Sequence, residues 1–314
     1  MIIGIQEEQP ELSSSSASVP TFELVGPDNA PVVVVLGGIS ASRHVTSTPE
    51  NPEPGWWDSF VGYSKTIDTN RFRVLSIDYQ AIGRKGQPLT TYDQAFALAS
   101  ALDASGISCV RAIVGASYGG MVALAFGGLA PDRVGHLVVI GAAHESTPLS
   151  TALRILQRRI VELGIKTGRA HDALVIARGL AMTTYSTAED FSDRFAAEHQ
   201  DPRVTRRLIA DELASSGERF GRRCTPERFL AISQSLDFHR VSPEDIRVPT
   251  TLIAVEEDAL VPVRQVRELA IRLGARCRLV ELHSRYGHDT FLHAPELLAP
   301  FVSRSLSPLT LEDS

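Results

Sequence analysis

The chain has 314 residues, of which 43% are hydrophobic and 22% charged, a length that allows one large domain or two small ones with a sizeable core. Its 31 Lys and Arg residues stand against 37 Asp and Glu residues, which gives a net charge of −6 with neutral His. Because the basic residues are also scattered, the sequence disfavours a nucleic-acid-binding protein. The longest apolar run in the interior, residues 32–36, is much shorter than the roughly 20 residues that a membrane span requires. We therefore expect a soluble globular protein that spans no membrane.

Residues 1–20 are mostly polar and include four consecutive serines at 13–16, so we expect a flexible leader there. This segment has no positively charged start and no long apolar stretch, which argues against a secretory signal. The three cysteines, Cys109, Cys224 and Cys277, are odd in number and widely spaced, a pattern that fits neither a disulfide framework nor a zinc site. These features favour reduced cysteines, a cytoplasmic protein and no bound metal.

In the first half of the chain, β-branched apolar runs alternate with amphipathic segments. In chain order the pattern predicts a strand at 32–36, a strand at 72–78, a helix at 91–105, a strand at 109–114, a helix at 121–129 and a strand at 137–140. The short apolar runs are typical of strands buried on both faces. Their alternation with helices requires crossover connections between parallel neighbours. The sequence therefore predicts an α/β protein with a mostly parallel, doubly wound sheet.

Between residues 150 and 241 the pattern changes to helices only. Two apolar stripes at helical spacing support this change, formed by Leu153, Leu156, Ile160 and Leu163 and by Leu174, Ala177, Leu180 and Ala181. Beyond them the pattern predicts a strand at 250–255, a helix at 263–274, a strand at 277–282 and a closing helix at 295–306. We therefore expect a helical cap, 150–241, inserted into a core made of residues 21–149 and 242–314.

The segment Gly115-Ala116-Ser117-Tyr118-Gly119 lies between a predicted strand and a predicted helix. Glycines at the first and last positions allow a sharp strand-to-helix turn that holds the serine hydroxyl over the edge of the sheet. This placement, more than the five letters, predicts that Ser117 is a nucleophile.

A serine nucleophile needs a base, and the base needs a carboxylate that fixes its tautomer. Asp258 follows the strand predicted at 250–255, and His288 lies in the loop after the last predicted strand. The order Ser117, Asp258, His288 is the order expected for this type of fold. Glu256 and Glu257 are alternative acids that the sequence leaves open. The lesser alternatives for the base are His44, His144, His239 and His283.

Acyl transfer also needs backbone N–H groups that point at the developing oxyanion. One is expected from the residue after the nucleophile and one from a loop after an early strand. The sequence places Tyr118 and Ile39 at these positions, and Gly37 and Gly38 would let the early loop approach closely.

These motifs resemble the α/β-hydrolase superfamily and, within it, the homoserine O-acyltransferases, which acylate homoserine from acetyl-CoA or succinyl-CoA in methionine biosynthesis. The resemblance covers most of the chain after residue 30. It is carried by GGISASRHV (37–45), GWWDSFVG (55–62), GASYGG (115–120), LQRRIVELG (156–164), ARGLAMTTY (177–185), LDFHRV (236–241) and YGHDTFL (286–292). The stretch GAAHESTPLSTALRILQRRIVELG is most similar to the succinyl-transferring branch.

The resemblance implies an α/β-hydrolase fold and a two-step mechanism in which acyl-CoA is a co-substrate and no cofactor stays bound. It implies that Arg178 holds the carboxylate of homoserine, that Asp289 receives its amino group, and that Tyr185 belongs to the substrate pocket. A planar guanidinium suits such a carboxylate because it can bind both oxygens at once. The resemblance further implies a homodimer that contacts its partner through cap helices.

The sequence leaves four questions open. Serine differs from homoserine by one methylene, so a serine O-acyltransferase remains an alternative. An esterase or thioesterase would use the same triad, and a non-catalytic binding module is a third possibility. Succinyl and acetyl donors differ in a terminal carboxylate, which Arg43 or Arg84 could bind.

Overall fold

The computed structural model describes residues 19–196 and 201–307. Its core is a seven-stranded sheet in the order β1-β5-β2-β6-β7-β8-β9, in which only β1 is antiparallel to its neighbour. The strands are β1 (Phe22–Val25), β2 (Val32–Leu36), β5 (Arg73–Ile77), β6 (Ala112–Ala116), β7 (Leu137–Ile140), β8 (Thr250–Val255) and β9 (Cys277–Leu282). A separate short ladder joins β3 (Val61–Gly62) to β4 (Ile67–Asp68). The prediction of an α/β protein with a mostly parallel sheet is confirmed.

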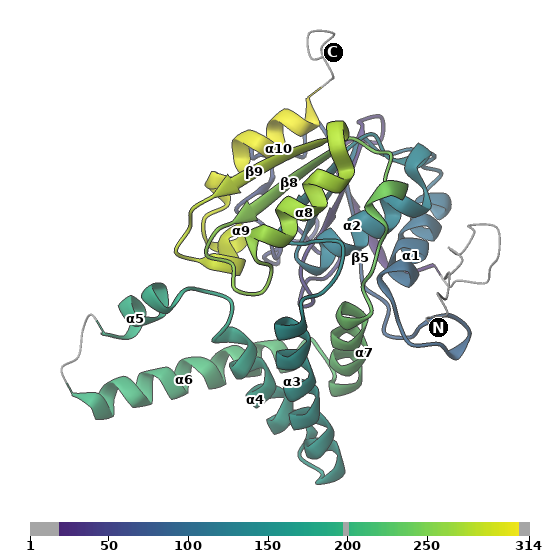
Figure 1. Ribbon diagram of the computed structural model, residues 1–314. Helices are drawn as coiled ribbons and strands as arrows, with labels where there is room; N and C mark the ends of the chain where they lie inside the picture. The colour runs from purple at the N-terminus through teal and green to yellow at the C-terminus, as the bar shows by residue number, and fades with distance from the viewer. Residues whose placement is uncertain (1–18, 197–200, 308–314) are drawn as a thin grey trace, which may run out of the picture.

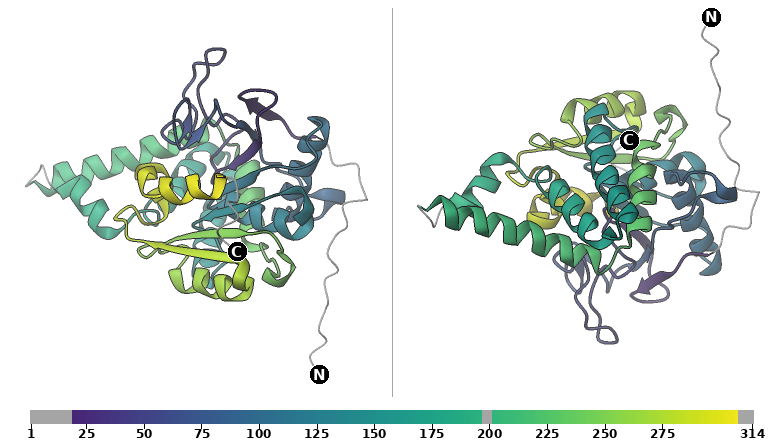
Figure 2. Two further views of the ribbon diagram at one scale, coloured as in Figure 1. Left: turned by 90° about the horizontal axis from the view of Figure 1, so that it is seen from above. Right: turned by 90° about the horizontal axis from the view of Figure 1, so that it is seen from below.

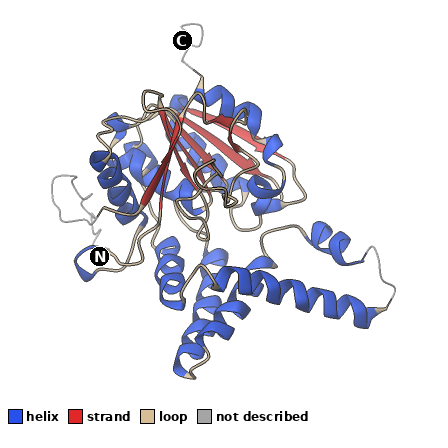
Figure 3. Ribbon diagram, turned by 180° about the vertical axis from the view of Figure 1, so that it is seen from behind, coloured by secondary structure: helices blue, strands red, loops and turns tan. Residues whose placement is uncertain are grey.

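Helices cover both faces of this sheet (Figures 1 and 3). One face carries α1 (Thr91–Ala104), α2 (Tyr118–Leu129) and α8 (Val263–Leu273). The other face carries α10 (Ala299–Leu306) and the segment around Trp57 and Phe60, with the short helix α9 (Thr290–His293) nearby. Along β2, Val34 packs on the first side and its neighbours Val33 and Val35 on the second. Both faces of the strand are therefore buried, which explains its unbroken apolar sequence.

Three predicted elements differ from the observed ones, and one edge strand of the sheet was not predicted. The strand predicted at 109–114 begins at Ala112, and the helix predicted at 121–129 already begins at Tyr118. The predicted closing helix, 295–306, is a 3-10 turn followed by α10. The edge strand β1 was not predicted, because its four residues are only partly buried and carry no periodic signal. The predicted leader, 1–20, lies outside the described residues except for its last two.

Five helices lie between β7 and β8 and form a cap at one end of the sheet (Figure 1). They are α3 (Pro148–Lys166), α4 (Ala170–Met182), α5 (Ala188–Ala196), α6 (Pro202–Gly221) and α7 (Pro226–Asp237). Helices α3, α6 and α7 each begin with proline after a residue whose side chain accepts a backbone N–H: Thr147, Asp201 and Thr225. Both features favour a helix start at that point. Figure 2 shows α5 and the first part of α6 extending away from the core.

The apolar face predicted for α3 is only half correct. Ile160 packs on the buried cluster of the cap and Leu153 is half-buried, but Leu156 and Leu163 are 54% and 63% exposed, and Leu149 on the same side is 62% exposed. The buried side of α3 also includes Gln157 and Val161. Among the helices of the described ranges, none is long and apolar enough to cross a membrane.

Candidate active site

Ser117 occupies a tight turn between β6 and α2. Its backbone has φ 54° and ψ −120°, a conformation that costs energy in any residue with a side chain. A Cβ on Gly119 would lie 2.2 Å from the carbonyl oxygen of Leu36, and one on Gly115 would lie 2.3 Å from the carbonyl oxygen of Gly119. Only glycine fits at both positions, so the local sequence dictates the turn that presents the serine hydroxyl.

The three residues predicted from chain order lie within hydrogen-bonding distance of one another. Ser117 Oγ is 2.8 Å from His288 Nε2, and His288 Nδ1 is 2.7 Å from Asp258 Oδ2. The second oxygen of Asp258 accepts the backbone N–H groups of Leu260 at 2.8 Å and Val261 at 2.9 Å. An ionised carboxylate only accepts hydrogen bonds, so His288 carries its proton on Nδ1 and leaves Nε2 free to accept the serine proton.

Burial and neighbouring charge shift the pKa of His288 in opposite directions. Burial by itself would lower its pKa, but the charge of Asp258 and the hydrogen bond to it outweigh burial, and the pKa is raised above the ordinary 6.5. Asp289 adds to this rise, whereas Arg154 opposes it. The imidazole is therefore a stronger base than an isolated histidine.

None of the alternative acids and bases contacts Ser117. Glu257 accepts the backbone N–H of Ser284 and faces His283, and Glu256 also lies against His283. The other candidate histidines have different partners: His44 pairs with Glu23 and His239 bonds to Thr91. His144 lies 3.8 Å from Glu268, and its buried Nδ1 has no hydrogen-bond partner.

The loop after β2 lies directly against the nucleophile. A Cβ on Gly38 would be only 3.9 Å from the Cβ of Ser117. The carbonyl oxygen of Gly37 accepts the N–H of Gly119 at 3.0 Å and the hydroxyl of Tyr79 at 2.7 Å, and these bonds fix the loop. Ile39 follows at the wall of the cavity. Its backbone N–H and that of Tyr118, the residue after the nucleophile, are thus carried on two rigid segments beside Ser117.

A cavity of about 990 Å³ lies between the sheet and the cap. Ser117 and His288 line its floor, while α3, α4, α6 and α7 provide its walls. A space of this size holds a substrate rather than a single water. Several residues that line the cavity were not predicted from the sequence, among them Trp56, Arg154 and Gln157. The polar positions of α3 at helical spacing were the signal that could have identified the last two.

The three residues that the resemblance assigned to substrate binding all line this cavity. Arg178 donates to the hydroxyl of Tyr185 at 3.0 Å and lies over the rings of Tyr185 and Phe220, each with its guanidinium carbon 5.0 Å from the ring centroid. The buried Nε of Arg178 has no hydrogen-bond partner. Asp289 is largely buried, and this burial raises the pKa of its carboxyl group despite opposing charges from His288 and Arg178. The two charged groups form no ion pair with each other, so both are available to a ligand.

Arg43 and Arg84 do not line the cavity, and their predicted role at the acyl group is wrong. Arg43 pairs with Asp78, and Arg84 pairs with Asp93 at 2.9 Å while lying over the ring of Phe96. Sequence alone gave no distances from which to exclude them. Among the residues that the structure describes, no group of three His, Cys, Asp or Glu side chains could hold a metal ion. All three cysteines are free.

Comparison with known proteins agrees with this geometry. A family model described as the alpha/beta hydrolase fold matches residues 31–295. A homoserine O-succinyltransferase from Xanthomonas campestris pv. campestris is 41% identical over 86% of this chain and 74% of its own length. A serine O-succinyltransferase from Litchfieldella anticariensis is 31% identical over 95% of this chain and 94% of its own.

A solved esterase superposes with a TM-score of 0.78 over 91% of this chain and 93% of its own, at 20% identity. That similarity shows the fold alone, because hydrolases and acyltransferases share it. The family model and the 41% identical relative support family membership as well as the fold, since each covers most of the chain. They show that the chain belongs to the homoserine O-acyltransferase family, a group of acyltransferases with the α/β-hydrolase fold.

Proposed function

We propose that this protein transfers a succinyl group from succinyl-CoA to the hydroxyl group of homoserine, through an acyl intermediate on Ser117. The observation that carries the proposal is the charge arrangement above the triad. An unpaired guanidinium, Arg178, and a separate carboxyl group, Asp289, line the same cavity as Ser117. Two opposite charges held apart match the carboxylate and the ammonium group of an amino acid.

In the first half-reaction, His288 takes the proton of Ser117 while Oγ attacks the thioester carbon. The oxyanion is held by the backbone N–H groups of Ile39 and Tyr118. When the intermediate collapses, the C–S bond breaks, His288 returns the proton to the sulfur, and CoA leaves. The acyl group then remains as an ester on Ser117.

In the second half-reaction, the hydroxyl of the amino acid attacks this ester. Arg178 and Asp289 orient the acceptor so that its hydroxyl lies near His288, which removes the proton and then returns it to Ser117 Oγ. The cap helices form one side of the cavity, and the water that they exclude from it would favour transfer over hydrolysis.

The names of the relatives support the choice of donor and acceptor. The 41% identical relative is a homoserine O-succinyltransferase, which supports both the succinyl donor and homoserine. The serine O-succinyltransferase at 31% identity supports serine as the alternative acceptor, since one methylene is worth only about 1–3 kcal/mol of discrimination. We place the reaction in methionine biosynthesis, in the cytoplasm.

The exposed stripe on α3 supports a homodimer. Leu149, Leu156 and Leu163 recur at intervals of seven residues and stay exposed in the single chain. Apolar side chains repeated along one helix face are typical of a protein interface. We propose that a second copy of the chain covers this stripe.

Steady-state assays test the function. Succinyl-CoA and acetyl-CoA are each combined with homoserine, serine or no acceptor, and both CoA release and product mass are followed. We expect the fastest CoA release with succinyl-CoA and homoserine, with O-succinylhomoserine as the product. Release of CoA at the same rate with and without an acceptor would identify a thioesterase instead.

A further inference from the structure

The wall of the catalytic cavity carries an unbalanced positive charge. Asp237, at the end of α7, accepts two arginines of α3: Arg154 Nε at 2.6 Å and an Arg158 terminal nitrogen at 2.5 Å. All three side chains are at least 86% buried. Neither arginine is within ion-pair distance of another carboxylate in the described chain. Two cations and one anion leave a net charge of +1 in a site with little water.

The two arginines have different surroundings. Arg158 is occupied by α7, because it also donates to the carbonyl oxygen and the hydroxyl of Ser233 at 3.1 and 3.0 Å. Arg154 lines the cavity, and its second contact is the hydroxyl of Ser146 at 2.9 Å. The excess charge is therefore accessible from the cavity at Arg154.

The surroundings of Arg154 are those of an anion site. On α3, Ser150, Arg154 and Gln157 are spaced by four and three residues, so they lie on one side of the helix and face the cavity together. The hydroxyl groups of Ser146 and Ser150 donate to the carbonyl oxygens of Leu236 and Leu260, so the donor that this wall adds beside the guanidinium is the side-chain amide of Gln157. An amide N–H next to a guanidinium is suited to a carboxylate.

We propose that Arg154 binds the free carboxylate of a dicarboxylic acyl group carried on Ser117, and thereby makes the site select a succinyl donor over an acetyl donor. This inference rests on the proposed acyl transfer and adds the residue that recognises the carboxylate of the donor. An acetyl group ends in a methyl group and would leave the excess positive charge of Arg154, Arg158 and Asp237 unbalanced. A succinyl group supplies a counter-ion inside the cavity.

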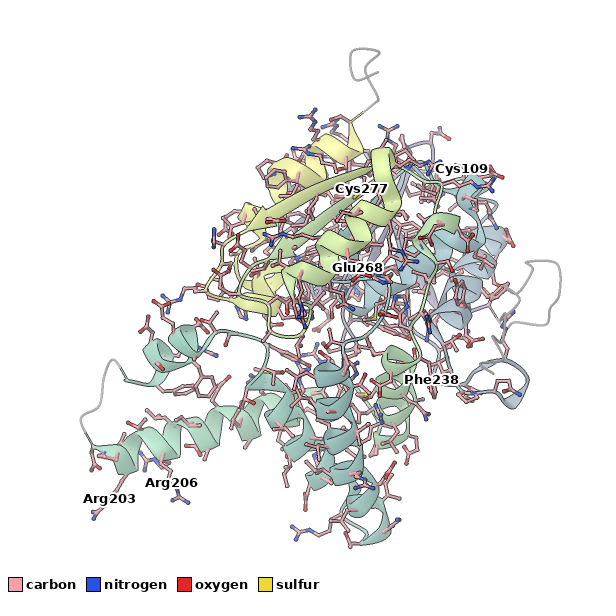
Figure 4. The ribbon with its side chains drawn as sticks, in the orientation of Figure 1. Cys109, Arg203, Arg206, Phe238, Glu268 and Cys277 are labelled. Carbon is pink, nitrogen blue, oxygen red and sulfur yellow. The ribbon has the colours of Figure 1, made fainter. Side chains whose placement is uncertain are left out.

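Position and burial separate Arg154 from the other arginines that line the cavity. Arg219 and Arg223 are exposed on or just after α6, and Arg219 pairs with Glu212. Arg178 is assigned to the acceptor. Arg154 is close enough to the triad for its charge to oppose the raised pKa of His288. By contrast, Arg228 donates to the carbonyl oxygen of Tyr79, at the other end of α7. Arg203 and Arg206 lie at the far end of α6, away from the sheet (Figure 4).

The test compares donors in matched variants. Arg154→Met replaces the charged side chain with an unbranched apolar one. Arg154→Lys keeps the positive charge but lacks the planar guanidinium group. The values of kcat/KM are measured for succinyl-CoA, acetyl-CoA and butyryl-CoA at fixed homoserine. Butyryl-CoA matches the length of the succinyl chain but ends in a methyl group.

We expect Arg154→Met to lower kcat/KM for succinyl-CoA by about 10- to 100-fold, the usual effect of losing a hydrogen bond to a charged group. The values for acetyl-CoA and butyryl-CoA should change by less than about threefold. Arg154→Lys should recover part of the succinyl-CoA activity. The control Arg228→Met should leave the ratio of kcat/KM for succinyl-CoA to kcat/KM for butyryl-CoA unchanged.

An equal loss for all three donors in Arg154→Met would overturn the proposal and leave Arg154 a structural link between α3 and α7. A changed donor ratio in Arg228→Met alone would overturn it in favour of that residue. A wild-type enzyme that prefers acetyl-CoA would also overturn it. Failure of the proposed function is visible separately, because the wild-type enzyme would then release no acceptor-dependent CoA from any donor.

Discussion

His288 combines deep burial with a raised pKa, because the adjacent carboxylate of Asp258 outweighs the cost of burying a charge. Only the neutral imidazole can accept the proton of Ser117. The protonated, inactive form therefore dominates at pH values below the raised pKa, and activity appears as the pH increases through it.

The first prediction follows from the raised pKa of His288. The acid limb of kcat/KM for the acyl donor should have an apparent pKa above 6.5, since this parameter reports the free enzyme. Asp258→Asn should move the limb to lower pH and reduce kcat by about 10³- to 10⁴-fold, because the tautomer of His288 is no longer fixed. A pH–rate profile of both enzymes measures this. A wild-type limb below 6.5 would be incompatible with the charge coupling.

The second prediction concerns Arg178, whose Nε is buried without a partner. Arg178→Gln should raise KM for homoserine by about 10- to 100-fold, because a charge-assisted contact is lost. The burst of CoA release in the first half-reaction should keep its rate, since the acyl donor does not use this group. Arg203→Gln, an exposed position on α6, serves as the control. Loss of the burst in Arg178→Gln would show that the residue acts on the donor or on the fold.

Single residues differ in how far the sequence could predict them. Ser117, Asp258 and His288 followed from local motifs at the ends of strands and from their order. Arg154 was missed, because a cation within an amphipathic helix is usually a solvated surface group. Its role depends on Asp237, which is distant in sequence and reaches α3 only after the cap has folded.

At the scale of elements, the turn from β6 to α2 determines where the hydroxyl group of Ser117 lies. The third prediction is that Gly119→Ala destabilises the protein by about 1–3 kcal/mol, the usual cost of overpacking, because its Cβ would lie 2.2 Å from the Leu36 carbonyl oxygen. Gly128→Ala is the matched control in the same helix, where the nearest atom would be 4.0 Å away. Its stability should rise by about 0.5–1 kcal/mol. Urea unfolding of both variants measures the difference, and equal stabilities would contradict the turn geometry.

The elements of the core were easier to predict than those of the cap. Strands β2, β7 and β8 match the predicted ranges, because strands buried on both faces have continuous apolar sequences. The edge strand β9 also matches its predicted range, although only one of its residues is buried. On α3 the leucines were assigned to the buried face, but in the structure polar residues face the cavity. An apolar stripe on a helix indicates a contact without saying whether that contact lies within the chain.

At the scale of the whole molecule, the single chain leaves the apolar stripe of α3, formed by Leu149, Leu156 and Leu163, exposed. The fourth prediction is that the wild-type protein is a dimer, and that the double variant Leu156→Glu with Leu163→Glu is a monomer, because charges at such an interface are costly to bury. Sedimentation velocity measures the mass of each. Ile271→Glu, at an exposed position of α8 in the core, should remain a dimer. A monomeric wild-type protein at micromolar concentration would refute the interface.

In the proposed reaction the core supplies Ser117 and Asp289, and the cap supplies Arg154 and Arg178. The most direct measurement is the intact mass of the enzyme after brief mixing with succinyl-CoA alone and again after adding homoserine. We predict a mass increase of one succinyl group located on Ser117, absent in Ser117→Ala, which disappears when homoserine is added and yields O-succinylhomoserine. Discharge of the acyl group to water at the same rate, with homoserine unchanged, would contradict acyl transfer as the function of this chain.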